Sequence, residues 1–395
     1  DAAYSLTLAN GIYAAVDADG NGSEDNTLTI TPTVNLTHDV TIVGGATSST
    51  YELKVLDNGF LDGNDSITGG AGSDTLEGGL GNDTLSGGAI ATYSGSDSID
   101  AGGGNDLIVQ TLYHTVNDTI IGGADIDKLT VTQSNGLTDL DNVTQVETIE
   151  LLSGLGANFS YTISDASAFD EDTTGVTIDG DALASTEALV FSATNLTRSI
   201  TILGGAGNDT IIDGGGNDSI VTNAGNDNIT LSGAGVNTVS SGSGTDSIIL
   251  GAGTDYVLAG SDNDTVVGGA NLTVADTLDG GSEIDLLTIS NDNSTNDLNN
   301  VTRFETIRLA AGQSYQYVIG NNSLFDQDTV AVTVDAQALG STDSVNFDAS
   351  NLDRSISVVG GAGHDTLFGG AGADTLFGGL ANDVLQGAGG SDSIV

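Results

Sequence analysis

The sequence predicts an all-β fold built from short strands and glycine turns. Its last thirty-six residues, 360–395, are four nine-residue units that follow one another without a gap. Each unit opens with glycines, which adopt positive φ angles without steric cost and so form tight turns. Each unit closes with a short apolar segment such as TLF or SIV, which suits a strand. Each unit is therefore predicted to be one turn followed by one short strand.

Aspartate recurs in these units at positions 365, 374, 383 and 392, and an aliphatic residue follows two positions later each time. This GGxGxD pattern resembles the calcium-binding nonapeptide repeat of the RTX family, and most closely that of bacterial RTX surface-layer and extracellular-matrix proteins. The resemblance implies a parallel β-roll, solenoid-like and elongated, with Ca²⁺ ions between successive turns.

Three blocks carry the pattern, over residues 61–128, 204–286 and 360–395. One unit of the second block has Asn237 where an aspartate is expected, and the turns before Asp97, Asp118 and Asp276 lack the complete glycine pattern. The resemblance implies that the aspartate of each matching turn binds Ca²⁺. The predicted ligands are Asp65, Asp74, Asp83, Asp97, Asp106, Asp118, Asp127, Asp209, Asp218, Asp227, Asp246, Asp255, Asp264, Asp276, Asp285, Asp365, Asp374, Asp383 and Asp392.

The spacing also gives a physical reason for a cation. Two consecutive units would form one coil of 18 residues, which places Asp209 over Asp227 and Asp246 over Asp264. Coils stack at the spacing of adjacent strands, roughly 4.8 Å. Two carboxylates roughly 5 Å apart repel by roughly 3 kcal/mol at an effective dielectric constant near 20. Ca²⁺ takes several oxygen ligands in tolerant geometry, so folding is expected to depend on it. The alternative is that the aspartates only cap tight turns.

Spacers rich in predicted strands, residues 1–60, 129–203 and 287–359, alternate with the blocks. DIDKLTVTQ from Asp125 matches EIDLLTISN from Glu283, an offset of 158 residues. NLTRSITILGGAGNDT from Asn195 likewise matches NLDRSISVVGGAGHDT from Asn351, an offset of 156 residues. Alternating polar and apolar residues predict strands in these spacers. Long units are thus repeated along the chain, and each of them contains nonapeptides.

A second type of calcium site is possible near the start of the chain. Asp17, Asp19 and Asn21 fall at positions 1, 3 and 5 of a loop that resembles the first half of an EF-hand, but Leu28 stands where the bidentate glutamate is expected. Asp25 is one acidic residue that could substitute for it. The segment is predicted to be either a calcium loop or a plain solvated turn.

Composition excludes several classes of function. Lys and Arg total 6 against 55 Asp and Glu, a formal charge of −49, which argues against nucleic acid and anionic membranes as partners. The chain has no cysteine and therefore no disulfides or thiolate metal sites. No apolar run approaches the roughly 18 residues of a membrane span. The sequence also lacks an HExxH or GxSxG segment, and no enzymatic activity is expected.

These observations predict a calcium-dependent structural protein of the bacterial cell surface, an S-layer or extracellular-matrix subunit that folds and assembles outside the cell. The resemblance implies type I secretion. The expected partners are further copies of the chain, in a sheet or filament, and a cell-surface polysaccharide. Two alternatives are the repeat stalk of an RTX adhesin and the calcium-binding C-terminal region of a secreted RTX enzyme. The missing initiator Met and the end in mid-repeat suggest a segment of a longer protein.

Overall fold

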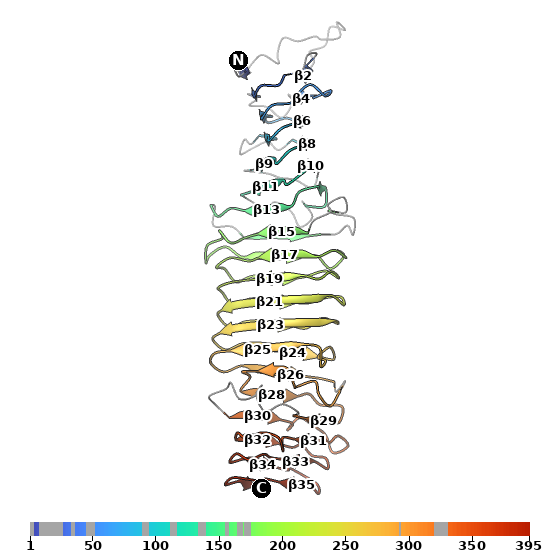
Figure 1. Ribbon diagram of the computed structural model, residues 1–395, viewed down its shortest axis with the longest axis vertical. Helices are drawn as coiled ribbons and strands as arrows, with labels where there is room; N and C mark the ends of the chain where they lie inside the picture. Colours follow the sequence, from blue (N-terminus) through green and yellow to red (C-terminus); the bar gives the residue numbers. More distant parts are fainter. Residues whose placement is uncertain are drawn as a thin grey trace. The chain divides into compact units, whose positions relative to one another are not determined.

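The computed structural model of the chain describes residues 4–7, 27–32, 36–44, 52–88, 95–110, 117–132, 140–154, 158–163, 169, 175–291, 294–319 and 331–395. Every regular element in these ranges is a β-strand, and neighbouring strands run parallel (Figure 1). The predicted all-β parallel solenoid is therefore confirmed. The same ranges contain no helix with the length and apolarity of a membrane span.

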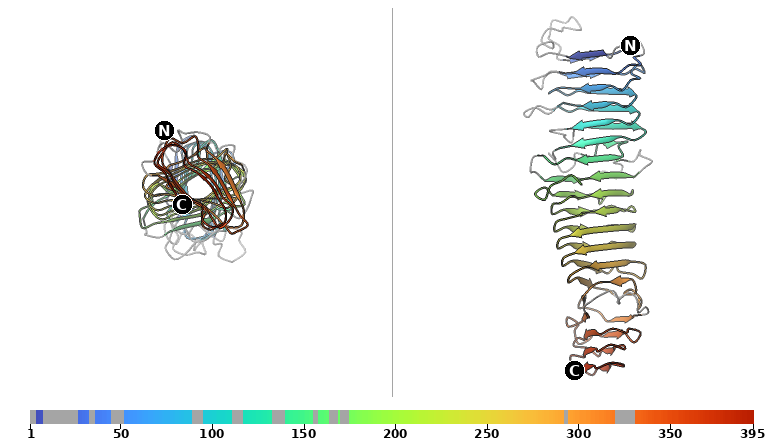
Figure 2. Two further views of the ribbon diagram at one scale, coloured as in Figure 1. Left: turned by 90° about the horizontal axis from the view of Figure 1, so that it is seen from below. Right: turned by 60° about the vertical axis from the view of Figure 1, so that its left-hand side comes forward.

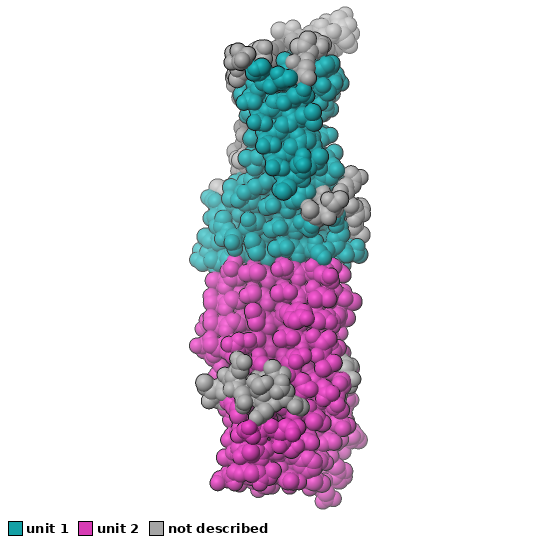
Figure 3. Space-filling model, viewed as in Figure 1, with its two compact units in different colours: residues 1–206 teal, residues 207–395 magenta. Residues whose placement is uncertain are grey.

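The chain forms two compact units, Asp1–Ala206 and Gly207–Val395 (Figure 3). In unit 1, the odd-numbered strands pair in the order β1-β3-β5-β7-β9-β11-β13-β15-β17, the even-numbered ones in the order β2-β4-β6-β8-β10-β12, and β14 pairs with β16. The strands are β1 (Tyr4–Thr7), β2 (Thr27–Ile30), β3 (Val40–Val43), β4 (Glu52–Val55), β5 (Ser66–Thr68), β6 (Thr75–Leu80), β7 (Thr84–Ser86), β8 (Ser98–Gly103), β9 (Leu107–Gln110), β10 (Thr119–Ala124), β11 (Lys128–Val131), β12 (Val143–Thr144), β13 (Thr148–Leu151), β14 (Phe159–Thr162), β15 (Val176–Asp179), β16 (Leu189–Ser192) and β17 (Ile200–Leu203).

Unit 2 has the same plan. Its strands pair in the orders β19-β21-β23-β25-β27, β18-β20-β22-β24-β26-β28-β30-β32-β34-β36 and β29-β31-β33-β35. They are β18 (Thr210–Ile212), β19 (Ser219–Val221), β20 (Asn228–Thr230), β21 (Val236–Ser243), β22 (Ser247–Ile249), β23 (Thr254–Ser261), β24 (Thr265–Gly269), β25 (Thr277–Gly281), β26 (Leu286–Ile289), β27 (Val301–Thr302), β28 (Thr306–Leu309), β29 (Tyr315–Val318), β30 (Val332–Asp335), β31 (Val345–Asp348), β32 (Ile356–Val359), β33 (Thr366–Phe368), β34 (Thr375–Phe377), β35 (Val384–Gln386) and β36 (Ser393–Ile394).

A strand pairs with the one two further along the chain, so two strands and two turns make one coil. Ile211 on β18 pairs with Ile229 on β20, and Ile229 pairs with Ile248 on β22. The right-hand view in Figure 2 shows the strands within each unit lying one above another. The two-nonapeptide coil expected from the sequence is present, and interruptions of the pattern lengthen it from 18 residues to as many as 23.

The core of each coil is a narrow column of apolar side chains. Leu76, Ile99 and Ile120 pair across consecutive strands of unit 1 and are fully buried. In the spacers the column contains aromatic rings, among them Tyr317 and Phe347, which are also fully buried. The spacer coils therefore bury larger side chains than the nonapeptide coils do.

Candidate metal centre

The nonapeptide aspartates form ladders that run from coil to coil. In unit 2 the backbone N–H of Asp209 donates to Oδ1 of Asp227, and that of Asp227 donates to Oδ1 of Asp246, both at 2.8 Å. The ladder continues from Asp246 to Asp264 at 2.8 Å and from Asp264 to Asp285 at 2.7 Å. Each carboxylate therefore uses one oxygen to bind the turn of the preceding coil.

The opposite turns and the last block carry the same contact. These contacts join, N–H donor first, Asp218 to Asn237 (3.0 Å), Asp255 to Asp276 (2.8 Å), Asp365 to Asp383 (2.9 Å) and Asp374 to Asp392 (3.0 Å). The stacking predicted from the 18-residue spacing is thus present.

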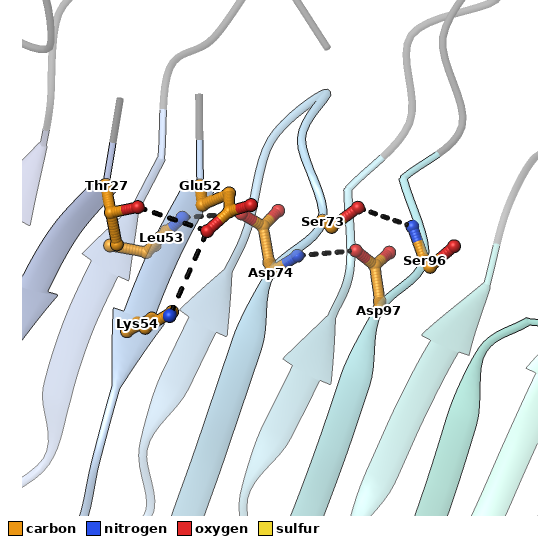
Figure 4. Close-up of polar contacts among 8 residues, drawn as sticks. All are labelled: Thr27, Glu52, Leu53, Lys54, Ser73, Asp74, Ser96 and Asp97. Atoms are coloured by element: carbon orange, nitrogen blue, oxygen red, sulfur yellow. Dashed lines mark hydrogen bonds and ion pairs between the residues drawn. The ribbon is translucent and has the colours of Figure 1, made fainter. Parts of the chain in front are cut away.

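Unit 1 contains the equivalent ladders, part of which is drawn in Figure 4. There the N–H of Leu53 donates to Oδ1 of Asp74 at 2.7 Å, and the N–H of Asp74 donates to Oδ1 of Asp97 at 2.9 Å. The other contacts, donor first, join Val40 to Asp65, Asp65 to Asp83, Asp83 to Asp106, Asp97 to Asp118 and Asp106 to Asp127. Asp97, Asp118 and Asp276 thus occupy ladder positions although their turns lack the full glycine pattern.

The first glycine of a nonapeptide makes room for the aspartate five residues later. A Cβ atom on Gly369 would lie 2.2 Å from Oδ2 of Asp374, and one on Gly360 would lie 2.4 Å from Oδ2 of Asp365. Such contacts are far shorter than van der Waals separation, so a side chain there would displace the carboxylate. Glycine is therefore required at this position by the packing of the aspartate carboxylate as well as by the turn.

The second oxygen of many ladder aspartates has no hydrogen-bond donor. Among the described residues, Oδ2 of Asp65, Asp83, Asp106, Asp264 and Asp285 is buried without one. A buried polar atom without a partner costs about 1–3 kcal/mol, and more when it is charged. These oxygens are the chemical signature of a ligand position for a hard cation, and they fit Ca²⁺.

Burial makes the ladder carboxyls weak acids in the absence of a cation. Desolvation, together with the charges of neighbouring carboxylates, raises the pKa of Asp83, Asp106, Asp264 and Asp285 to about 7. Desolvation likewise raises the pKa of Asp65, Asp74 and Asp246 to about 6. At neutral pH, burial in the folded chain therefore disfavours the ionised form of these ladder carboxyls.

Four ion pairs among the described residues lie outside the ladders. Lys54, Lys128, Arg303 and Arg308 pair with Glu52, Glu150, Asp279 and Asp335, all outside the ladders. The described residues also contain no group of three or more His, Cys, Asp or Glu side chains placed to hold a metal. With one carboxylate per turn, a bound Ca²⁺ would take its remaining ligands from backbone carbonyls of the glycine turns. The assignment of individual aspartates as ligands stays a prediction.

The EF-hand-like segment with Asp17, Asp19, Asn21 and Asp25 lies outside the described residues. Asn237 keeps its place in a ladder, where it accepts a hydrogen bond, but it brings no negative charge.

The sequence interpretation missed two glutamates that complete ladders. Oε2 of Glu147 accepts from the N–H of Asp127 at 2.7 Å, and Oε2 of Glu305 accepts from the N–H of Asp285 at 2.8 Å. Both stand in the spacer sequence ETI, where Glu-Thr-Ile replaces the Asp-Thr-Leu or Asp-Ser-Ile of a nonapeptide. That substitution was visible in the sequence, but the missing glycine turn concealed its meaning.

Comparison with known proteins agrees with this geometry. Residues 61–89, 90–109, 201–229, 231–266 and 359–394 match the family model of the RTX calcium-binding nonapeptide repeat. No curated protein matches the chain. The matched segments contain most of the ladder aspartates, whereas the Glu147 and Glu305 positions lie outside them. These segments are similar to RTX calcium-binding nonapeptide repeats, and in the parallel β-solenoid of this chain they alternate with spacer coils.

Proposed function

We propose that the chain is a calcium-dependent structural protein of the bacterial cell surface, a subunit of an S-layer or extracellular matrix. The observation that supports calcium dependence is the set of buried Asp ladders whose second oxygens lack a donor. Burial disfavours the ionised form of these carboxylates, and a bound cation would offset that cost.

Calcium would then act as a switch between an unfolded and a folded chain. Ion binding is coupled to folding because the ladders exist only when the coils are stacked. Extracellular calcium modules bind with dissociation constants of about 10⁻⁴–10⁻³ M, so a chain of this kind stays unfolded where free calcium is low. Its formal charge of −49 favours expansion in that state. This supports secretion in an unfolded form, followed by folding outside.

The structural role is favoured by the two levels of repetition. Nonapeptide coils occur in both units, and the spacers recur at offsets of 158 and 156 residues. Matching positions at the ends of the first two blocks even share an unusual backbone conformation, since Asp125 and Glu283 have φ angles of 84° and 80°. A regular series of equivalent surfaces suits assembly with further copies of the chain, and attachment to a cell-surface polysaccharide is the partner interaction we add to this proposal.

Negative-stain electron microscopy of the purified chain tests the role. With millimolar CaCl₂ we expect extended sheets or filaments, which EDTA disperses and renewed calcium restores, whereas MgCl₂ does not replace calcium. Folding without assembly, seen as β-rich single particles at every protein concentration, would favour the stalk of an adhesin or the calcium-binding region of a secreted enzyme. A chain that shows no response to calcium would contradict the proposal altogether.

A further inference from the structure

Three large apolar side chains are exposed together on the outward face of β21 and β23 in unit 2. These are the two longest strands of the described residues, with eight residues each, and they pair along their length (Figure 1). Val236 is 47% exposed, Tyr256 46% and Leu258 53%. The alternation of buried and exposed residues along both strands places all three on the same side of the sheet.

The residues around this apolar group add no net charge to the face. By register, Tyr256 lies between two threonines of β21 and β25, and Leu258 lies between a serine and an aspartate. These neighbours are Thr238, Thr277, Ser240 and Asp279. Asp279 is the one charged side chain that β21, β23 and β25 direct outward, and Arg303 neutralises it in a bidentate ion pair. The face is thus neutral in a chain whose formal charge is −49.

The equivalent strands of unit 1 have a different surface. β8 and β23 both lead into a glycine of positive φ, Gly102 at 105° and Gly260 at 115°, so their outward positions correspond. In unit 1, β6 and β8 direct Glu77 and Asp100 outward, and these two carboxylates lie opposite each other in the register. Two copies of the chain that met through this surface would bring like charges together, which is unfavourable. The neutral face of unit 2 does not oppose such a contact.

The relief and the size of the neutral face suit a weak contact with a protein. A groove with a volume of about 420 Å³, lined by Ser240, Leu258 and Arg303 among others, gives room for side chains of a partner. Strands lie roughly 4.8 Å apart and rise roughly 3.3 Å per residue, so the three strands present roughly 300–400 Å². Stable interfaces bury about 800 Å² on each partner. One contact of this size is therefore weak, and it becomes effective when many copies make it at once.

We propose that the neutral face of β21, β23 and β25 packs against the same face of a second copy of the chain. The inference rests on the proposed function and names the surface through which the copies assemble. Two copies repel each other wherever their acidic turns approach, so contact is favoured where the local charge is zero. A cationic partner would instead be attracted to the turns. The face is also self-complementary in charge, since it carries one cation and one anion, as a two-fold interface requires.

This contact should depend on calcium. The turns that join these strands to the neighbouring ones carry ladder aspartates, among them Asp246 and Asp264. The face therefore exists only while the coils are stacked, and its exposure to a second copy follows the folding of the chain.

Sedimentation velocity of the full chain in millimolar CaCl₂, over a wide range of protein concentration, tests the contact. It compares the wild type with Tyr256→Glu, which puts a charge on the face, and with Ile249→Glu, a charge-matched control at a 40% exposed side chain on β22, in the other sheet. Tyr256→Glu should weaken self-association at least about tenfold, because like charges then oppose each other across the contact. Ile249→Glu should match the wild type. Circular dichroism should show the wild-type calcium midpoint for both variants.

A mixture of two variants tests whether the face meets itself. Tyr256→Glu and Tyr256→Lys, mixed in equal amounts, should associate again, because opposite charges then lie on the two faces. A mixture that stays monomeric while the wild type associates overturns the pairing of like faces.

The outcomes separate this contact from the proposed function. A wild type that folds in calcium but stays monomeric at every concentration rejects both. Equal self-association of the wild type and Tyr256→Glu rejects this face alone. If, in addition, immobilised dextran retains the wild type but not Tyr256→Glu, the face belongs to a polysaccharide instead. Should Tyr256→Glu fail to fold, Tyr256→Thr takes its place: weaker self-association supports the contact, and unchanged self-association rejects it.

Discussion

Nonapeptide coils and spacer coils within unit 2 have the same parallel strand geometry, but different side-chain interactions stabilise them. A nonapeptide strand such as β20 buries one aliphatic side chain, Ile229, and its turns carry ladder aspartates. A spacer strand such as β29 buries two aromatic side chains, Tyr315 and Tyr317, whose rings stack with centroids 6.1 Å apart. The hydroxyl of Tyr315 also donates to the carbonyl of Ala310 at 2.8 Å.

The difference indicates two sources of stability for one architecture. Full burial of a large apolar side chain contributes about 1.5–3 kcal/mol, so spacer coils gain much of their stability from their own residues. Nonapeptide coils bury less and carry ladders whose charges oppose folding. We therefore expect the spacer coils to tolerate conditions under which the nonapeptide coils come apart, and the following experiments test that expectation.

Removal of calcium should have the largest effect. At pH 7.5, EDTA should abolish most of the β-sheet signal in far-UV circular dichroism, because the ladder aspartates then repel one another without a counter-ion. Hydrogen exchange at low residual calcium should find whatever protection is left in the spacers. Addition of MgCl₂ in place of CaCl₂ serves as the control. A spectrum unchanged by EDTA would show that the aspartates only cap turns.

Acid should partly replace calcium. The ladder carboxyls with a folded pKa of about 7 and a usual pKa of 3.8 bind protons more tightly in the folded chain. Their contribution favours folding below pH 3.8 and is lost as the pH rises from about 4 to about 7. In EDTA, lowering the pH from 7.5 to 5 should therefore restore β-sheet signal.

The same protonation should weaken calcium binding, so the calcium midpoint of folding should rise as the pH falls below about 7. A calcium-free chain that is folded at pH 7.5 and unfolds at pH 5 would contradict the assignment of these pKa shifts.

Truncation of a spacer aromatic should have an intermediate effect. Phe347→Ala removes a fully buried ring and should lower the free energy of unfolding in saturating calcium by about 3–5 kcal/mol. Urea denaturation measures this loss. Leu258→Ala, at a side chain that is 53% exposed in a nonapeptide coil, is the control and should change stability by less than about 0.5 kcal/mol. Equal losses in the two variants would refute the packing described here.

Neutralising a terminal ladder glutamate should have the smallest effect. Glu305→Gln keeps an acceptor for the N–H of Asp285 but removes the charge, and it should cost at most about 1–3 kcal/mol. A calcium titration followed by circular dichroism would show the shifted midpoint. Glu283→Gln, at an exposed position that accepts from the N–H of Asp262, is the matched control. If both variants behave alike, Glu305 contributes no more than surface charge.

Much of the fold and of the ladder was predictable from the sequence, because each part of the nonapeptide corresponds to one structural feature. The glycines specify the turns, the aliphatic residue specifies the core, and the spacing of nine places Asp365 against Asp383. Glu147 and Glu305 were not predicted, because each reaches the ladder from a spacer position where the glycine turn of the repeat is missing. Asp97 and Asp118 are the opposite case. Their turns lack the full glycine pattern, but stacking of the coils keeps both residues in the ladder.

The direction of the ladder hydrogen bonds makes the two ends of a nonapeptide block unlike. Since each carboxylate accepts from the coil before it, the first coil of a block presents carboxylate oxygens and its last coil presents backbone N–H groups. The residues before a block supply main-chain donors to the carboxylates of its first coil, as the N–H of Val345 does for Asp365. The spacer after a block supplies a glutamate that accepts from the last coil, as Glu305 does for the N–H of Asp285. A block can therefore be joined to a spacer in one orientation only. The order of segments along the chain is dictated by chemistry at the junctions, and an engineered array that reversed or shuffled them would leave donors facing donors.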